Sequence, residues 1–272
     1  MGVWTRVSAA GRCCVRGAHV VGLLLAAGVD FRLNKPESGA AGAVQIHRWC
    51  RRIVQAMGVS VEVVGRAPAG GAVVSNHLSY LDILLYSAVR PFVMVSKSDV
   101  RGWPLLGWLT AQAGTVYVDR CGTPESYPAV NAAMAGAYRT GLPVLFFPEG
   151  TTTNASEVMP FRRGLFHSVL HGHVPLRTAA LRYSLGDGNS GATVADDVCW
   201  WGDALLAPHL IKLLGLREVR ATVRFEEREI DGLDRFELAE NARGAVEEMY
   251  WGLESATREV VRARFVEAIS VS

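Results

Sequence analysis

Two patterns that mark common enzyme chemistries are missing from this chain of 272 residues. It has no G-x-S-x-G, which would present a nucleophilic serine in an α/β-hydrolase, and no G-x-x-x-x-G-K phosphate-binding loop. The five cysteines are odd in number and contain no C-x-x-C pair, so they indicate free thiols rather than a zinc or redox site. The sequence therefore offers no candidate for covalent catalysis.

An excess of charge of one sign is also missing, because 28 basic and 26 acidic residues leave a formal net charge of +2. Nucleic-acid-binding domains usually carry a strongly basic stripe, so this balance argues against a nucleic-acid partner. The N-terminal apolar stretch, residues 18–29, falls short of the roughly 20 residues that a spanning helix needs. It follows Arg6, Arg12 and Arg16. We expect residues 1–42 to be a membrane-associating segment, with a signal peptide or a plain docking helix as alternatives.

From residue 59 onwards, apolar runs of strand length alternate with stretches of helical periodicity. The predicted strands are 59–64, 72–75, 92–96, 114–118, 143–147, 175–183 and 219–226; the predicted helices are 79–89, 103–112, 125–140, 164–171 and 204–214. This alternation predicts an α/β fold, with a mixed, largely parallel sheet flanked by helices. We place this domain at residues 43–230. Residues 231–272 predict a C-terminal extension of one or two amphipathic helices.

Three further segments each allow two interpretations. Residues 43–57 predict a basic helix that either lies on anionic lipid or carries a solvated charged face. The adjacent Trp200 and Trp201 either lie at a lipid interface or fill the core. His167 and His171 lie one helical turn apart, and together with His173 they suggest a metal site. No acid completes that set, so we expect no metal ligands.

The stretch SNHLSYLDI, residues 75–83, places His77 five positions before Asp82. In a structural interpretation, Ser79 to Asp82 is a capping box with Ser79 as the N-cap, and His77 is only a loop residue. In a catalytic interpretation, the Asp82 carboxylate fixes the imidazole tautomer of His77. The second ring nitrogen is then free to take a proton from an alcohol. The stretch by itself is compatible with both.

Two more stretches place polar side chains at the ends of predicted strands. Residues 146–154, FFPEGTTTN, end an apolar strand in an acid, a glycine and a run of hydroxyl and amide side chains. Residues 114–120, GTVYVDR, end in Asp119 and Arg120. The Arg120 guanidinium could bind a phosphate or pair with Asp119. Each stretch alone is also compatible with an ordinary turn.

In this order and spacing, the three stretches resemble the glycerolipid acyltransferase family, which includes 1-acylglycerol-3-phosphate and other lysophospholipid acyltransferases. Its N-H-x-x-x-x-D block is similar to residues 76–82, its strand ending in Asp-Arg to residues 114–120, and its F-P-E-G-T block to residues 147–151. The resemblance covers about residues 45–226. It implies transfer of a fatty acyl group from acyl-CoA or an acyl carrier protein to the free hydroxyl of a lysophospholipid, without a cofactor. A membrane surface, on the cytoplasmic face of a bacterial inner membrane, is the implied location.

The resemblance also implies roles for single residues. His77 corresponds to the general base and Asp82 to the carboxylate that orients it. The implied substrate-binding residues are Asn76, Arg120, Glu149, Gly150 and Thr151. No metal ligand is implied.

The chain departs from the family at Thr152, where many members have arginine in a G-T-R-S continuation. This removes a bidentate phosphate ligand, for which Arg162 or Arg163 could compensate. We expect 1-acyl-sn-glycerol 3-phosphate as the acceptor, giving phosphatidic acid. The alternatives are lysophosphatidylcholine or lyso-ornithine lipid as acceptor, or a lipid-binding relative without activity.

Overall fold

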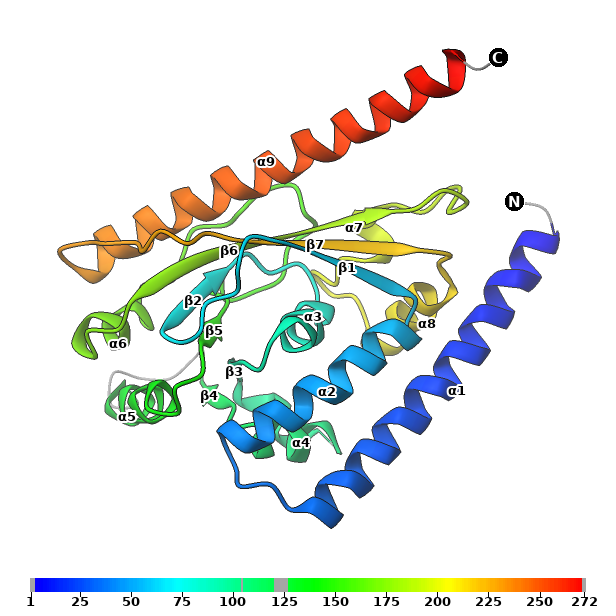
Figure 1. The fold of residues 1–272 in the computed structure, drawn as a ribbon. Helices are drawn as coiled ribbons and strands as arrows, with labels where there is room; N and C mark the ends of the chain where they lie inside the picture. Colours follow the sequence, from blue (N-terminus) through cyan, green and yellow to red (C-terminus); the bar gives the residue numbers. More distant parts are fainter. Residues whose placement is uncertain (1–2, 104, 120–126, 271–272) are drawn as a thin grey trace.

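A seven-stranded sheet forms the centre of the molecule in a computed structural model that describes residues 3–103, 105–119 and 127–270 (Figure 1). The strands are β1 (Val59–Val64), β2 (Ala72–Ser75), β3 (Val93–Lys97), β4 (Val116–Val118), β5 (Val144–Phe146), β6 (Leu176–Leu185) and β7 (Val219–Phe225). Their order is β1-β7-β6-β2-β5-β3-β4. All neighbours are parallel except β6 and β7. The predicted mixed, largely parallel sheet is confirmed.

Helices cover both faces of this sheet (Figure 1). The helix α9 (Arg235–Ser270) crosses one face, and α2 (Ala40–Ala56) and α3 (Leu81–Val89) lie against the other. Between these layers β2 is buried along its whole length. This burial explains why residues 72–75 are so apolar, because a central parallel strand has no solvent face.

The other helical elements lie around the ends of the sheet. They are the 3-10 helix η1 (Ser98–Gly102), α4 (Leu106–Gln112), α5 (Tyr127–Tyr138), α6 (Phe166–His171), α7 (Val194–Asp197) and α8 (Leu206–Gly215). The short helix α7 lies between the predicted strand 175–183 and the predicted helix 204–214, where no helix was expected. It forms because the Thr193 hydroxyl caps it by accepting the backbone N–H of Asp196 at 3.0 Å.

A glycine pattern, G-x-G-x-x-G at residues 186–191, lies between β6 and α7. A dinucleotide-binding fingerprint requires this pattern between a strand and a helix within a parallel βαβ unit. Here the following helix has only four residues, and the next strand, β7, runs antiparallel to β6. The segment is therefore a connecting loop between two antiparallel strands.

The N-terminal helix α1 (Val3–Asn34) is much longer than the apolar stretch within it. Residues 8–34 form a helix long and apolar enough to cross a bilayer, so the shortness inferred from residues 18–29 alone was misleading. In Figure 1, α1 lies outside α2 and beside α8. Its inner face buries Val20, Ala27 and Phe31, which dock it on the domain.

Polar contacts fix α1 at two places. Arg12 donates to the carbonyl of Gly215 at 2.7 Å, and Arg16 donates to the carbonyls of Leu214 and Leu216. These guanidinium groups satisfy carbonyls at the C-terminus of α8, where a positive charge is favourable. Further along, Asp30 accepts the indole N–H of Trp49 in α2 at 2.7 Å. The helix is thus held along the surface of the domain.

Candidate active site

The site lies at the carboxyl ends of β2, β5 and β6, where open α/β sheets bind ligands. After β2 ends at Ser75, four residues of irregular backbone carry His77 toward the start of α3. His77 Nδ1 lies 2.8 Å from Asp82 Oδ2, and both side chains are buried. The histidine precedes the helix, so the chain can fold back and bring the two groups together. Because Nδ1 bonds the carboxylate, Nε2 is the nitrogen left to act as a base.

The Asp82 carboxylate is surrounded by hydrogen-bond donors. Besides His77, Oδ2 accepts the backbone N–H groups of Leu78 at 2.6 Å and Ser79 at 3.0 Å. Oδ1 accepts the hydroxyl of Tyr183 at 2.5 Å. Several hydrogen bonds to one carboxylate fix its position. Asp82 is therefore a rigid anchor for the imidazole.

The capping-box interpretation was wrong about Ser79 as the N-cap. Helix α3 begins at Leu81, its N-cap is Tyr80, and the Ser79 hydroxyl has no hydrogen-bond partner among the described residues. The other half of the capping box is present, because the Asp82 side chain accepts the Ser79 N–H. One carboxylate therefore both closes the turn and holds His77.

Tyr183 is a site residue that the sequence analysis missed. It lies on β6, which continues past the end of β2 and so reaches over Asp82. Burial, together with the nearby Asp82 charge, raises the pKa of Tyr183 well above its usual value. The hydroxyl thus stays protonated and donates a hydrogen bond to the carboxylate. A buried tyrosine usually needs such a partner, and this was the only signal available from the sequence.

Replacing Tyr183 by Phe is expected to lower kcat for acyl transfer about tenfold while KM changes little, because one donor to the Asp82 carboxylate is lost. Steady-state kinetics on the purified full chain measure both constants. Tyr138→Phe is the matched control, since this hydroxyl is hydrogen-bonded to Ser168 and lies outside the three sequence blocks. A rise in KM at constant kcat would show that Tyr183 contacts substrate instead of positioning Asp82.

The loop after β5 packs directly on His77. The rings of Phe147 and His77 stack with centroids 4.0 Å apart and planes 9° from parallel, which fixes the plane of the imidazole. One oxygen of Glu149 accepts the backbone N–H of His77 at 2.7 Å, and the other accepts that of Met159 at 3.1 Å. Thr153 N–H donates to the His77 carbonyl at 3.0 Å. The two sequence blocks are therefore built into one structure.

Glu149 is buried, with 3% of its surface exposed. This burial raises its pKa to about 7, although the backbone N–H groups of Met159 and His77 act in the opposite direction. Both carboxylate oxygens are occupied by backbone amides. The geometry thus gives Glu149 a contact with the loop that carries His77, whereas the resemblance implied contact with the acceptor.

The remaining predicted substrate-binding residues differ in their surroundings. Asn76 is buried and bonds Leu181 of β6 twice, donating to its carbonyl at 2.9 Å and accepting its N–H at 2.8 Å. Gly150 has a positive φ of 72°, and a Cβ there would lie 2.5 Å from Nε of Arg162. Thr151 beside it is exposed. Arg120 lies outside the described residues.

The arginines that follow the acceptor block have separate neighbours. Arg162 is exposed, and its side chain passes next to Gly150. Arg163 instead lies over the ring of Phe236, 4.7 Å from its centroid. Of these two arginines, Arg162 is therefore the one whose side chain lies against the block. Among the described residues, no group of three or more His, Cys, Asp or Glu side chains is placed to hold a metal ion.

These features define a class of site: a buried histidine held by a carboxylate at the open end of an α/β sheet. Among the described residues, no serine or cysteine side chain is hydrogen-bonded to its imidazole. This arrangement is typical of a general base that activates a hydroxyl of the substrate itself. Comparisons with known proteins agree with this class. A family model described as Acyltransferase matches residues 60–182.

Relatives and a solved structure extend the match. A lyso-ornithine lipid O-acyltransferase of Pseudomonas aeruginosa is 35% identical over 91% of this chain and 96% of that protein. A 1-acyl-sn-glycerol-3-phosphate acyltransferase of Neisseria meningitidis is 32% identical over 61% of this chain and 67% of that protein. The acyltransferase PlsC of Thermotoga maritima has the same fold, with a TM-score of 0.59, 16% identity and 78% and 79% coverage. The chain belongs to the glycerolipid acyltransferase family and is an O-acyltransferase of the lysophospholipid type.

Proposed function

We propose that the protein transfers a fatty acyl group from a thioester of coenzyme A or acyl carrier protein to a lyso-lipid hydroxyl in one direct step. The acceptor oxygen attacks the thioester carbonyl while His77 Nε2 takes its proton. The carbon–sulfur bond then breaks, and the imidazolium returns the proton to the thiolate. The observation that carries this proposal is the 2.8 Å contact of His77 Nδ1 with Asp82, which leaves Nε2 free to act.

We propose a positioning role for Glu149 and an acceptor-facing role for Gly150 and Thr151. The Glu149 carboxylate accepts a hydrogen bond from the His77 backbone N–H, and this bond is stronger when the carboxylate is ionised. With a pKa of about 7, this contact strengthens as the pH rises through neutrality. The exposed Thr151 and the neighbouring Arg162 are the groups in this block that can meet a headgroup.

For the acceptor we propose lyso-ornithine lipid, ahead of 1-acylglycerol 3-phosphate. The ornithine headgroup carries a carboxylate and an amine but no phosphate. Its binding therefore does not need the phosphate-binding arginine that Thr152 replaces. Arg162 supplies one guanidinium for a carboxylate. The relative that matches nearly the whole chain is named for this acceptor.

An acceptor panel tests this proposal. Purified full-length protein is expected to acylate lyso-ornithine lipid faster than 1-acylglycerol 3-phosphate or lysophosphatidylcholine. Thr152→Arg is expected to raise kcat/KM for the phosphate acceptor about tenfold, because a charge-assisted hydrogen bond is added. Thr140→Arg is the control, because Thr140 is half-buried like Thr152 but lies between α5 and the amino end of β5. A wild-type preference for 1-acylglycerol 3-phosphate would establish the phosphatidic acid alternative.

We also propose that α1 lies on the membrane surface. Its inner face and its polar contacts dock it on α2 and α8, whereas Val21, Leu25, Val29 and Leu33 are exposed in a row on the outer face. A helix docked along its length contacts a bilayer with one face instead of crossing it. In this orientation the outer face of α1 would contact the surface in which lyso-lipids reside.

A further inference from the structure

Helix α8 and the turn before it present an apolar surface that no other described element covers. Leu205 is 72% exposed, Ile211 61% and Trp201 42%, while His209, Leu213 and Leu214 on the opposite side of the helix are buried. A docked helix of a soluble domain normally turns its polar side to water. We call Trp201, Leu205 and Ile211 the α8 surface.

The tryptophan of this surface is suited to contact with lipid. The Trp201 indole N–H donates to the carbonyl of Ala195 at 3.0 Å, and that of Trp200 to Ala204 at 2.7 Å. The polar groups of both rings are thus satisfied within the protein, and the exposed part of Trp201 is apolar. Tryptophan is enriched at the membrane–water boundary, where such rings reside.

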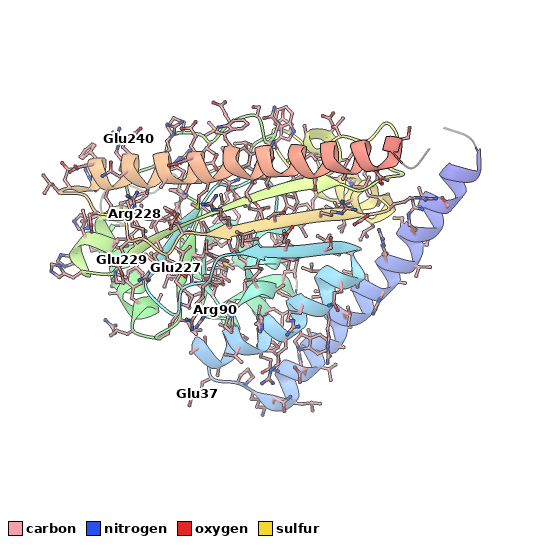
Figure 2. The ribbon with its side chains drawn as sticks, turned by 45° about the horizontal axis from the view of Figure 1, so that its top comes forward. Glu37, Arg90, Glu227, Arg228, Glu229 and Glu240 are labelled. Carbon is pink, nitrogen blue, oxygen red and sulfur yellow. The ribbon has the colours of Figure 1, made fainter. Side chains whose placement is uncertain are left out.

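Charged groups of both signs flank the α8 surface: Asp196 and Asp203 are exposed near Trp201, and basic groups gather on the side toward α1. Lys212, Arg217 and Arg12 line a cavity of about 340 Å³ where α1 meets α8, with Asp197 as the acidic residue of its lining. Basic groups beside an apolar face are attracted to anionic headgroups. Figure 2 shows Glu227, Arg228 and Glu229 together at the connection between β7 and α9, on the side of the molecule away from α1. This mixed cluster therefore lies on a different side of the molecule from α1 and from the basic groups that line the cavity.

The α8 surface is also joined to the loop that carries His77. The backbone N–H of Trp200 donates to the carbonyl of Leu78 at 2.9 Å. The Tyr80 hydroxyl lies 3.2 Å from Nδ1 of His209, and its ring packs edge-on against Trp200. A bilayer in contact with this surface would thus lie next to the start of α3.

We propose that the α8 surface is a second bilayer-contact site, continuous with the outer face of α1, and that it presents membrane-held lyso-lipid to His77. Arg12 and Arg16 bond the end of α8 to α1, so both faces approach the bilayer together. The presentation of substrate rests on the proposed function, whereas the bilayer contact itself does not.

The first test measures contact with lipid directly. Full-length protein is mixed with vesicles of phosphatidylethanolamine and brominated phosphatidylglycerol, and the fluorescence of wild type is compared with that of Trp201→Phe. The difference between the two spectra is the emission of Trp201, which bromine is expected to quench. An unquenched difference spectrum overturns the proposal, and no acyl transfer is needed for this reading.

The second test measures delivery of substrate. Activity is measured on acceptor held in vesicles and on acceptor held in detergent micelles, and the first is divided by the second. The double variant Leu205→Ser, Ile211→Ser is expected to lower this ratio about tenfold or more. Leu233→Ser, which alters a leucine that is 96% exposed near the start of α9, is expected to leave this ratio unchanged. An unchanged ratio in the double variant contradicts the proposal. A double variant that instead shifts the oligomeric state in sedimentation identifies the surface as an interface between two copies. Absence of wild-type transfer in micelles would count against the proposed function alone.

Discussion

Replacing Asp82 by Asn is expected to reduce acyl transfer by about 10³–10⁴-fold, the scale seen when the acid that orients a catalytic histidine is neutralised. The Asp82 oxygens accept four hydrogen bonds, from His77, Leu78, Ser79 and Tyr183. An asparagine accepts through one oxygen only, and its amide group would face donors. The imidazole would lose its fixed tautomer, and the turn before α3 would lose its closing bonds.

The same substitution is expected to lower the free energy of unfolding by about 3 kcal/mol, because buried donors are left unpaired. Thermal or denaturant unfolding measures this loss beside the activity. Asp99→Asn, at an exposed carboxylate paired with Lys97, is the matched control and should change neither quantity much. If folded Asp82→Asn protein retains activity within tenfold of wild type, the carboxylate does not orient the base.

Replacing His77 by Gln is expected to reduce kcat by about 10²–10⁴-fold, which is the usual contribution of a general base. Glutamine can still fill part of the space against Phe147, so the fold should persist. Binding of acceptor to folded His77→Gln protein should remain close to that of wild type, because His77 acts on the proton and not on the headgroup.

His171→Gln provides the comparison for this variant, since His171 is an exposed histidine on α6 that stacks on His167. It should retain wild-type kcat. A His77→Gln protein that turns over at a rate similar to that of His171→Gln would remove histidine from the mechanism.

The class of fold and the pairing of His77 with Asp82 could be predicted from the sequence because both depend on local patterns. Every predicted strand is present, since each was a short apolar run next to a turn signal. The spacing of histidine and acid identified the pair once the later block supported it. Such signals involve residues close together in the chain, so a single sequence is enough to detect them.

The order of the strands could not be read in this way. β1 pairs with β7, whose residues lie 160 positions later, and the antiparallel pairing of β7 with β6 has no local signature. Tyr183 was missed for the same reason, because its partner Asp82 is 101 positions away. Burial decided the interpretation of Glu149, and burial depends on how the β5 loop packs under His77.

The N-terminal segment illustrates a different limit. Its helix continues well beyond the apolar residues 18–29, because Arg12 and Arg16 are satisfied by carbonyls of α8. Those carbonyls are far away in sequence. Arg12 and its partner Gly215, for example, are 203 positions apart. A hydropathy pattern counts such arginines as solvent-facing, whereas tertiary contacts make them part of a docked helix.

Direct transfer by His77, with no acyl-enzyme, can be distinguished from covalent catalysis by one labelling experiment. Purified wild-type and His77→Gln proteins are incubated with labelled acyl-CoA and lyso-ornithine lipid, and the label is measured in both lipid and protein. We expect label in the lipid with wild type alone, and none bound covalently to either protein. Label retained on the protein, or lipid labelled as fast by His77→Gln as by wild type, would contradict this expectation.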